Sequence, residues 1–397
     1  KIKHELHTVT HYVFVGREEL RPPYAEPFET WIASATTTAP QIDLRMTDNA
    51  ALYFTSGTTG MPKATLLTHE NLDFACHVEQ SHHTQTHEDN FLCIPPLYHT
   101  GAKMHWFGNL LVGAPAVILK GVSPKWILEA ISEERVTIVW LLVPWAMDIL
   151  LAIENGDVNL DDYELDQWRL MHIGAQPVPR SLIQEWKKIF PHHQYDTNYG
   201  LTECTGPGCV HLGMENGHKV GAIGVAGKDW DFKIVDTDLK VVPAGEVGEL
   251  AVKGSGVMRG YYKNPQATND VLIDGWLLTG DMARMDADGF IWLVDRKKDV
   301  IITGGENIYP VEIEDFLHQH DAVKDVAVIG LPDQRLGEIV AAVVELKAEA
   351  QATTEEILAF CDALPRYKRP RVIILDPVPR NPTGKIEKPK LRAMYGA

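Results

Sequence analysis

Short apolar runs rich in β-branched residues alternate with stretches of helical length through the first half of the chain. A continuous apolar run is typical of a strand buried on both faces, whereas apolar residues that recur at every third or fourth position indicate a helix. The first pattern predicts strands and the second predicts helices between them. The expected strands are residues 51–55, 91–94, 116–119, 137–143 and 169–173, and the expected helices are residues 124–134, 145–154 and 180–190.

This alternation predicts an α/β fold with mostly parallel sheets, because parallel strands need long crossover connections, usually helices. Ser123 precedes Pro124 and is expected to cap the helix that begins there.

The pattern changes after residue 218, where glycines separate short strands. A return to alternating helices and strands near residue 298 predicts a small α+β C-terminal domain. Three parts are therefore expected: the α/β part of a large domain at residues 1–218, a small β-rich subdomain at 219–297 and the C-terminal domain at 298–397.

The composition narrows the classes of partner. The 37 lysines and arginines against 54 aspartates and glutamates leave a formal charge of −17, which repels nucleic-acid phosphates and anionic lipid. No nucleic-acid partner is therefore expected. No transmembrane segment is expected either, because every apolar run is too short to cross a bilayer. Five cysteines without a CxxC pair predict small buried side chains in a reducing cytoplasm. The oligomeric state stays open, a homo-oligomer included.

The segment most indicative of chemistry directly follows the expected strand that begins at Ala51. It reads Thr-Ser-Gly-Thr-Thr-Gly-Met-Pro-Lys from Thr55 to Lys63. Hydroxyls and glycines at the exit of a strand offer side-chain donors and unobstructed backbone N–H groups to a polyphosphate. The Gly-Lys-Ser/Thr of a Walker motif is absent from this loop. The predicted phosphate-binding residues are Thr55, Ser56, Gly57, Thr58, Thr59, Gly60 and Lys63.

Five motifs, in order along the chain, resemble those of the adenylate-forming superfamily, which contains acyl-CoA synthetases, luciferases and peptide-synthetase adenylation domains. The loop at 55–63 is similar to the first signature, and Tyr-Gly-Leu-Thr-Glu at 199–203 and Leu-Thr-Gly-Asp at 278–281 are similar to the second and third. Residues 295–310 resemble the inter-domain region, and Pro-Thr-Gly-Lys at 382–385 resembles the C-terminal lysine motif. The resemblance covers nearly the whole chain and implies an acyl-CoA synthetase of the fatty-acid or aryl-acid type.

The resemblance implies an enzyme, an AMP-forming acid–thiol ligase. Such an enzyme joins a carboxylic acid to the α-phosphate of ATP, releases pyrophosphate and passes the acyl group to CoA. Two anions meet in the first step, so cationic and N–H groups must neutralise charge in the transition state. By resemblance Lys385 is the catalytic cation and Glu203 holds Mg²⁺, a cation that prefers oxygen ligands.

The remaining nucleotide contacts also come from the resemblance. Asp281 would bind both ribose hydroxyls, and Arg296 would make a second ribose or phosphate contact. Tyr199 would stack on adenine, and Thr202 would contact the α-phosphate. The predicted ATP-binding set further includes Gly174, Ala175, Gln176, Asn198 and Gly200, together with Lys385.

The acid would lie beside His99, which stands where acyl-CoA synthetases carry an aromatic-then-histidine motif. The resemblance makes His99 a second catalytic candidate, and a hydrogen-bonded core histidine is the alternative. Residues 95–101 contain no aspartate to pair an amino group, which favours an acid without an α-amine. The acid itself stays open. The predicted acyl pocket consists of His99, Phe107, Trp145, Gly174, Gly200, Cys204 and Pro207.

Gly304 and Gly305 resemble the part of the family that lines the CoA channel, and Lys298 resembles its hinge, which implies a mobile C-terminal domain. Two alternatives remain: transfer of the acyl group to a carrier protein, and an inert fragment that only binds nucleotide. The 54 residues before the phosphate loop are fewer than the family usually carries. We therefore expect an N-terminal portion of the large domain to be missing from this chain.

Three histidines, His82, His83 and His87, lie close together in a segment whose other residues are mostly polar. Polar neighbours on all sides indicate a solvated helix end or loop, and the sequence favours this interpretation over metal binding.

Overall fold

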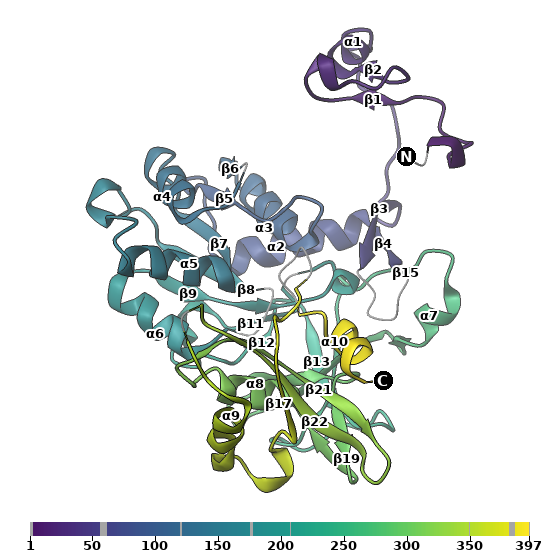
Figure 1. Ribbon diagram of the computed structural model, residues 1–397. Coiled ribbons are helices and arrows are strands. Elements are labelled where there is room, and N and C mark those ends of the chain that lie inside the picture. The colour runs from purple at the N-terminus through teal and green to yellow at the C-terminus, as the bar shows by residue number, and fades with distance from the viewer. Residues whose placement is uncertain are drawn as a thin grey trace. The chain divides into compact units, whose positions relative to one another are not determined.

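The computed structural model describes residues 3–55, 62–119, 121–174, 178–206, 208–348, 350–380 and 386–396 (Figure 1). It divides into two compact units, residues 1–45 and 46–397. The first unit contains a short parallel strand pair, β1 (Val13–Phe14) with β2 (Glu26–Pro27), and helix α1 (Phe28–Ala33). Ala25 is the only apolar residue described in this unit that is buried, so the unit has almost no core of its own.

A five-stranded sheet in the second unit is parallel throughout, in the order β6-β5-β7-β8-β9. Nearly every residue of its inner strands is buried and apolar, as expected for a sheet covered on both faces. The predicted α/β class with a parallel sheet is confirmed. The strands are β5 (Phe91–Cys93), β6 (Ala116–Ile118), β7 (Ile138–Leu142), β8 (Leu170–Gly174) and β9 (Gln194–Asp196).

Alternate side chains of this sheet enter two different cores. Leu92, Val139 and Met171 join the apolar faces of helices α4, α5 and α6. Their neighbours Phe91, Ile138 and Leu170 join a second cluster on the opposite face, where Trp106 of α3 packs. Helix α2 packs against α3. The helices are α2 (His69–His82), α3 (Thr100–Leu111), α4 (Pro124–Glu133), α5 (Val143–Glu154) and α6 (Arg180–Ile189).

The helix predicted to begin at Pro124 has the expected cap, because the Ser123 side chain accepts a hydrogen bond of 3.2 Å from the backbone N–H of Trp126. The apolar pattern does not predict α2 and α3. Both helices turn polar residues inward, among them Glu79 of α2 and His105 of α3, which are fully buried. Buried polar residues hide the helical period of hydrophobicity on which the prediction relies.

The two strands of an antiparallel hairpin flank the predicted phosphate loop. Strand β3 (Asn49–Thr55) pairs with β4 (Lys63–Thr68), and β15 (Gly260–Tyr261) pairs with β4 on its other side. Directly after β4, Thr68 and Asn71 form a reciprocal capping box that begins α2.

The segment from Asn198 to Arg296 is dominated by antiparallel strands. One sheet has the order β10-β11-β12, and a second has the order β13-β14-β17-β16, with β18 also paired to β17. The strands are β10 (Asn198–Tyr199), β11 (Val210–His211), β12 (Val225–Ala226), β13 (Asp231–Val235), β14 (Gly248–Lys253), β16 (Leu272–Ile273), β17 (Trp276–Met285) and β18 (Ile291–Arg296), and helix α7 spans Pro265–Asn269.

The C-terminal part is a mixed sheet in the order β20-β19-β22-β21, with β23 parallel to β22. Val326 and Val328 of β21 face a core with helices α8 and α9, whereas Ala327 and Ile329 face a core with α10. The elements are β19 (Ile301–Thr303), β20 (Glu306–Ile308), α8 (Pro310–Leu317), β21 (Val323–Asp333), β22 (Gly337–Leu346), α9 (Thr354–Phe360), β23 (Val372–Leu375) and α10 (Lys388–Tyr395).

The five cysteines are all free and buried, as predicted. Within the described ranges, no helix combines the length and the apolar character that crossing a membrane requires.

The prediction for the histidines of residues 82–87 is wrong for His83. Its side chain is fully buried, whereas His82 is half-buried and His87 is exposed. The chain turns immediately after α2, and His83 there meets His172 of β8 and Asp196 of β9. Gln85 and Asp89 of the same segment are buried too, so polar residue type does not predict exposure here.

An ion pair between the buried Asp89 and the half-buried Arg169 ties the turn after α2 to the parallel sheet. The carboxylate of Asp89 accepts hydrogen bonds from Arg169 at 2.8 and 3.0 Å and from the hydroxyl of Thr137 at 2.7 Å. Burial would raise the pKa of Asp89, but these hydrogen bonds and one from the backbone of Thr86 outweigh it and lower the pKa. The pair therefore contributes stability that is present when the carboxyl is ionised.

We expect Asp89→Asn to reduce the free energy of unfolding at neutral pH by about 1–3 kcal/mol, because a charge-assisted hydrogen-bond network is lost. The lowered pKa makes this contribution complete above the ordinary aspartate value of 3.8, and it disappears as pH falls through the folded-state pKa. The difference in melting temperature between the two proteins should thus narrow in acid. The exposed Asp157→Asn serves as control, and a difference that persists unchanged in acid would contradict the assignment.

Candidate functional site

The ends of the predicted phosphate loop meet in the hairpin, where Thr55 is the cross-strand partner of Lys63. Ser56, Gly57, Thr58, Thr59 and Gly60 lie outside the described residues, so their predicted role stays a prediction. The ammonium of Lys63 lies 4.9 Å from the ring centroid of Tyr261, at cation–π distance. This contact holds the cation at the start of β4.

Three residues from three separate motifs meet at one carboxylate. The hydroxyl of Tyr199 donates a 2.6 Å hydrogen bond to Oδ2 of Asp281, and Nε of Arg296 lies 3.0 Å from Oδ1 of the same side chain. Asp281 and Arg296 are cross-strand partners in β17 and β18, which places their side chains together. Burial and the charge of Asp281 raise the pKa of Tyr199 well above its usual value, so the phenol stays a donor.

Glu203, the predicted Mg²⁺ ligand, lies in the short 3₁₀ helix Thr202–Cys204, which follows β10. Its Oε1 accepts a 2.8 Å hydrogen bond from the hydroxyl of Tyr261. The same tyrosine ring carries the Lys63 ammonium on its face. Tyr261 therefore links the start of the hairpin strand β4 to the predicted metal ligand, and Thr202 lies beside that ligand in the same turn.

Gly174 ends β8 and faces Asn198 of β10. A Cβ at Gly174 would lie 3.7 Å from Oδ1 of Asn198 and 3.6 Å from Nε1 of Trp140. The predicted adenine residues Ala175 and Gln176 lie outside the described residues. The structure thus brings together the two described residues that flank the predicted adenine site, Gly174 and Asn198.

The predicted acyl-pocket residues come from separate elements. His99 is the half-buried residue before α3, Phe107 lies within α3 beside Met104, and Trp145 lies in α5 beside the α4–α6 core. Cys204 is fully buried, with its Sγ 3.8 Å from Sγ of Cys209. Gly200 is half-buried in the loop after β10, and Pro207 lies outside the described residues. A pocket formed by these residues stays a prediction.

The turn between β19 and β20 consists of Gly304 and Gly305, whose φ angles are +58° and +90°. Left-handed backbone at two successive positions favours glycine. Lys298 lies in the turn between β18 and β19, and Lys385 lies outside the described residues. The predicted channel and hinge residues therefore occupy turns, where a change of few dihedral angles can reorient the next segment of the chain.

The comparisons with known proteins agree with these motifs. The model of the AMP-binding enzyme family matches residues 1–262, and that of the AMP-binding enzyme C-terminal domain matches residues 312–385. This chain belongs to the AMP-binding enzyme family. The predicted resemblance to adenylate-forming enzymes is thereby confirmed.

Relatives at about one third identity cover nearly the whole chain. A feruloyl-CoA synthase of Amycolatopsis sp. is 34% identical over 381 residues, which are 95% of this chain and 75% of that protein. The structure resembles ATP-bound MatB from Rhodopseudomonas palustris with a TM-score of 0.85 at 29% identity, over 93% of this chain and 72% of the other. It also resembles o-succinylbenzoate CoA synthetase from Bacillus subtilis in complex with an acyl-adenylate intermediate, with a TM-score of 0.81 at 29% identity over 93% and 74%.

Sequence reasoning about this AMP-binding enzyme missed Tyr261 and Trp140. Tyr261 contacts both Lys63 and Glu203 but lies 58 residues after Glu203, so no local motif includes it. Trp140 lies within an apolar strand and reads as a core residue. Its ring nevertheless approaches Gly101 and Gly174, since a Cβ at these glycines would lie 2.7 and 3.6 Å from it.

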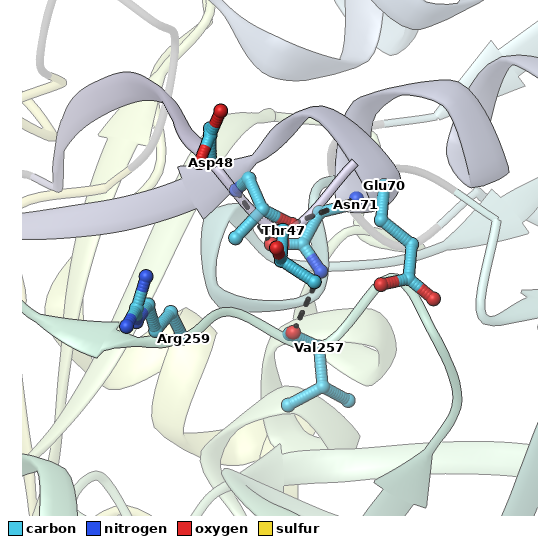
Figure 2. A pocket seen from close by; sticks show the side chains of 7 residues that line it. Thr47, Asp48, Glu70, Asn71, Val257 and Arg259 are labelled. Atoms are coloured by element: carbon cyan, nitrogen blue, oxygen red, sulfur yellow. Dashed lines mark hydrogen bonds between the residues drawn. The ribbon is translucent and has the colours of Figure 1, made fainter. Parts of the chain in front are cut away.

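A hollow of about 500 Å³ lies at the base of the hairpin, and its lining includes none of the predicted site residues (Figure 2). Asn71 donates hydrogen bonds from Nδ2 to the carbonyl oxygens of Val257, at 3.0 Å, and Ser255, at 2.7 Å. These bonds join the start of α2 to the segment before β15, a structural role. The lining residues are Thr47, Asp48, Thr68, Glu70, Asn71, Val257 and Arg259.

The convergence on Asp281 makes a prediction for this AMP-binding enzyme. Asp281→Asn should raise the KM for ATP by roughly 10- to 100-fold with a much smaller effect on kcat, because a ribose contact contributes equally to ground and transition states. Tyr199→Phe removes one hydrogen bond and keeps the carboxylate, so its effect on KM should be smaller. Initial-rate kinetics check both variants. A fall in kcat at unchanged KM would contradict the ribose assignment.

Proposed function

We propose that this chain activates an apolar carboxylic acid without an α-amine and delivers its acyl group to CoA. The proposal specifies the activity of its class, ATP-dependent formation of an acyl adenylate followed by thioester formation. The observation that carries it is the meeting of Tyr199, Asp281 and Arg296, which belong to three motifs far apart in the sequence. A nucleotide-binding role explains why these three residues meet at one buried carboxylate.

In the first step a carboxylate oxygen of the acid attacks the α-phosphorus of ATP, the bond to the β-phosphate bridging oxygen breaks, and pyrophosphate leaves with the electron pair. We assign the ribose to Asp281 and Arg296, and charge neutralisation to Lys63 and Lys385. A cation beside the reacting phosphate stabilises charge that redistributes in the transition state.

Glu203 suits a divalent cation because it offers carboxylate oxygens, and the hydrogen bond from Tyr261 to Oε1 orients the group. We assign it to Mg²⁺, which supplies neutralisation of the phosphate charge when bound. The protein's part is to fix the carboxylate through the ring that also contacts Lys63.

The second step requires an open path for the thiol, and the turn at Lys298 supports a hinge there. The residue before it, Lys297, bonds through its backbone N–H to Gly280 and through Nζ to Glu249, both in the β-rich segment. The residue after it, Asp299, lies 2.9 Å from Nη1 of Arg392 in α10. Side chains of Lys297 and Asp299 thus bond to different parts of the chain, and a hinge at Lys298 would let few residues absorb a rotation.

A basic hollow beside the predicted channel favours CoA over a carrier protein as acceptor. It has a volume of about 190 Å³ and includes Thr303 and Leu336, and the backbone N–H of Gly304 donates to the carbonyl of Leu336. Arginine guanidinium groups match phosphate oxygens, and the nucleotide part of CoA carries phosphates. The lining residues are Thr303, Leu336, Val340, Arg366, Tyr367, Arg369 and Arg371.

The acid assignment rests on the absence of a carboxylate in residues 95–101 and on the apolar character of Phe107 and Trp145. We place the acid near His99, at the start of α3. The cytoplasmic location predicted from the cysteines stays a prediction.

The test supplies the full chain with ATP, Mg²⁺ and carboxylic acids of graded size, and measures pyrophosphate and then thioester with CoA. We expect both products, and we expect Lys385→Ala to slow pyrophosphate release by roughly 100- to 1000-fold. Thioester formation from supplied acyl adenylate should change much less. No pyrophosphate with any acid would favour an inert binder, and pyrophosphate without CoA thioester would favour a carrier-protein acceptor.

A second experiment tests the basic hollow. Arg371→Ala should raise the KM for CoA by roughly tenfold, the loss of one charge-assisted contact of about 1.5 kcal/mol. The KM for pantetheine, which lacks the nucleotide phosphates, should not change. The exposed Lys347→Ala, beyond the other end of β22, controls for a general loss of positive charge. An equal rise in the KM for CoA and the KM for pantetheine would show that Arg371 does not bind the phosphates of CoA.

A further inference from the structure

Six polar side chains form a buried group between the parallel sheet and the helix pair α2 and α3. We call this group the histidine cluster. Each member is at most 1% exposed, and five elements or their ends contribute. Its members are Glu79 of α2, His83 directly after α2, His105 of α3, His172 of β8, Asp196 of β9 and His211 of β11.

The atoms of three members lie at distances typical of ligands around one metal ion. Nε2 of His83 is 3.1 Å from both Nδ1 of His172 and Oδ2 of Asp196, and the latter two atoms are 3.7 Å apart. Zinc bonds to nitrogen and oxygen of about 2.0–2.1 Å imply edges of about 3.3 Å in a tetrahedral site. The triangle therefore has the size of one face of such a site.

The other side of His83 faces a second set of ligand atoms. Oε2 of Glu79 lies 4.0 Å from Nδ1 of His83 and 2.8 Å from Nε2 of His105, and Oε1 lies 3.3 Å from Nε2 of His211. His83, His105 and His172 offer one ligand atom each within 4.8 Å of one another, and so do Glu79, His83 and His211. His83 is common to both sets.

Hydrogen bonds within the protein do not satisfy these rings. Five of the eight ring nitrogens lack an aligned partner: Nδ1 of His83, Nε2 of His105, Nε2 of His172 and both nitrogens of His211. Buried polar atoms in folded proteins are normally hydrogen-bonded, and exceptions require an explanation such as an ion. Nε2 of His105 is among these five although it lies 2.8 Å from Oε2 of Glu79.

The surroundings orient the cluster as ligands are oriented in metal proteins. Nδ1 of His105 lies 2.8 Å from the carbonyl oxygen of Gly101, so its N–H donates there and leaves Nε2 to face Glu79. Oδ1 of Asp196 accepts a 2.9 Å hydrogen bond from the backbone N–H of Gly213, which leaves Oδ2 for His83. Histidine ligands usually donate their second N–H to a carbonyl or carboxylate in this way.

The two carboxyl groups of the histidine cluster also favour a bound cation. Two carboxyl groups are buried together, and an ionised carboxylate away from water is costly unless a cation compensates it. A divalent cation bound among these rings would compensate both carboxylates.

We propose that the histidine cluster binds one divalent transition-metal ion of the zinc class, with His83 as the central ligand. Nitrogen donors distinguish this site from the oxygen site at Glu203, which suits Mg²⁺. The candidate ligands come from α2 and its C-terminal end, α3, β8, β9 and β11. Asn198 directly precedes Tyr199, and its Nδ2 lies 3.3 Å from Oε2 of Glu79. The ion therefore stabilises the side chains that pack behind the predicted nucleotide-binding residues. The site does not depend on the proposed acid or acceptor.

The experiment uses the full chain, stripped with a chelator and reloaded with Zn²⁺ or Co²⁺. We expect about one tightly held zinc per chain, a higher melting temperature for the loaded protein, and visible bands of Co²⁺ bound by nitrogen and oxygen without thiolate charge transfer. An unmodified chain that holds no ion after dialysis, or that melts at the same temperature with and without zinc, overturns the proposal. So does thiolate charge transfer, which would place the ion on cysteine.

Matched variants locate the ion. His83→Gln should reduce the zinc content at least roughly fivefold and abolish the zinc-dependent melting shift, whereas His87→Gln, exposed in the same segment, should retain both. His172→Gln provides a second test if His83→Gln does not fold by circular dichroism. Zinc content equal to that of the unmodified protein in a folded His83→Gln or His172→Gln overturns the assignment. Activity is not needed for any of these measurements.

Discussion

The buried carboxylate of Asp281 is the constraint on which the proposed nucleotide site depends. A carboxylate that is 5% exposed must be paired, and its two oxygens are taken by Tyr199 and Arg296. Tyr199 follows the last strand of the parallel sheet, and Arg296 ends β18 just before the turn at Lys298. One side chain thus joins the α/β part, the antiparallel sheet and the approach to the C-terminal part.

A second carboxylate plays a similar role on the other side of the site. Glu203 accepts a hydrogen bond from Tyr261, whose ring also contacts Lys63, so the hairpin that flanks the predicted phosphate loop is tied to the predicted metal ligand. The two carboxylates are 78 positions apart in the sequence. Both carboxylates accept a hydrogen bond from a tyrosine hydroxyl, which orients them as the proposed site for phosphate and cation requires.

The histidine cluster shows where local reasoning stops. His83 lies among polar residues in the sequence, and that context predicts a solvated position. The fold instead turns the chain back after α2, so His83 meets side chains from β8 and β9 that lie 89 and 113 residues away. Long-range contacts of this kind leave no local pattern in the sequence, because each partner lies in a segment that reads as ordinary strand or helix.

The sequence by itself determined the fold class, most strands of the parallel sheet and the family, because hydrophobic period and nucleotide-binding motifs are local properties. It also determined the cap at Ser123 and the burial of the cysteines. Only the tertiary structure decided that Tyr261 supports Glu203, that Trp140 approaches Gly174 and that His83 is buried. Strand register and helix packing set these contacts, and both depend on the whole chain because each joins residues that are far apart along it.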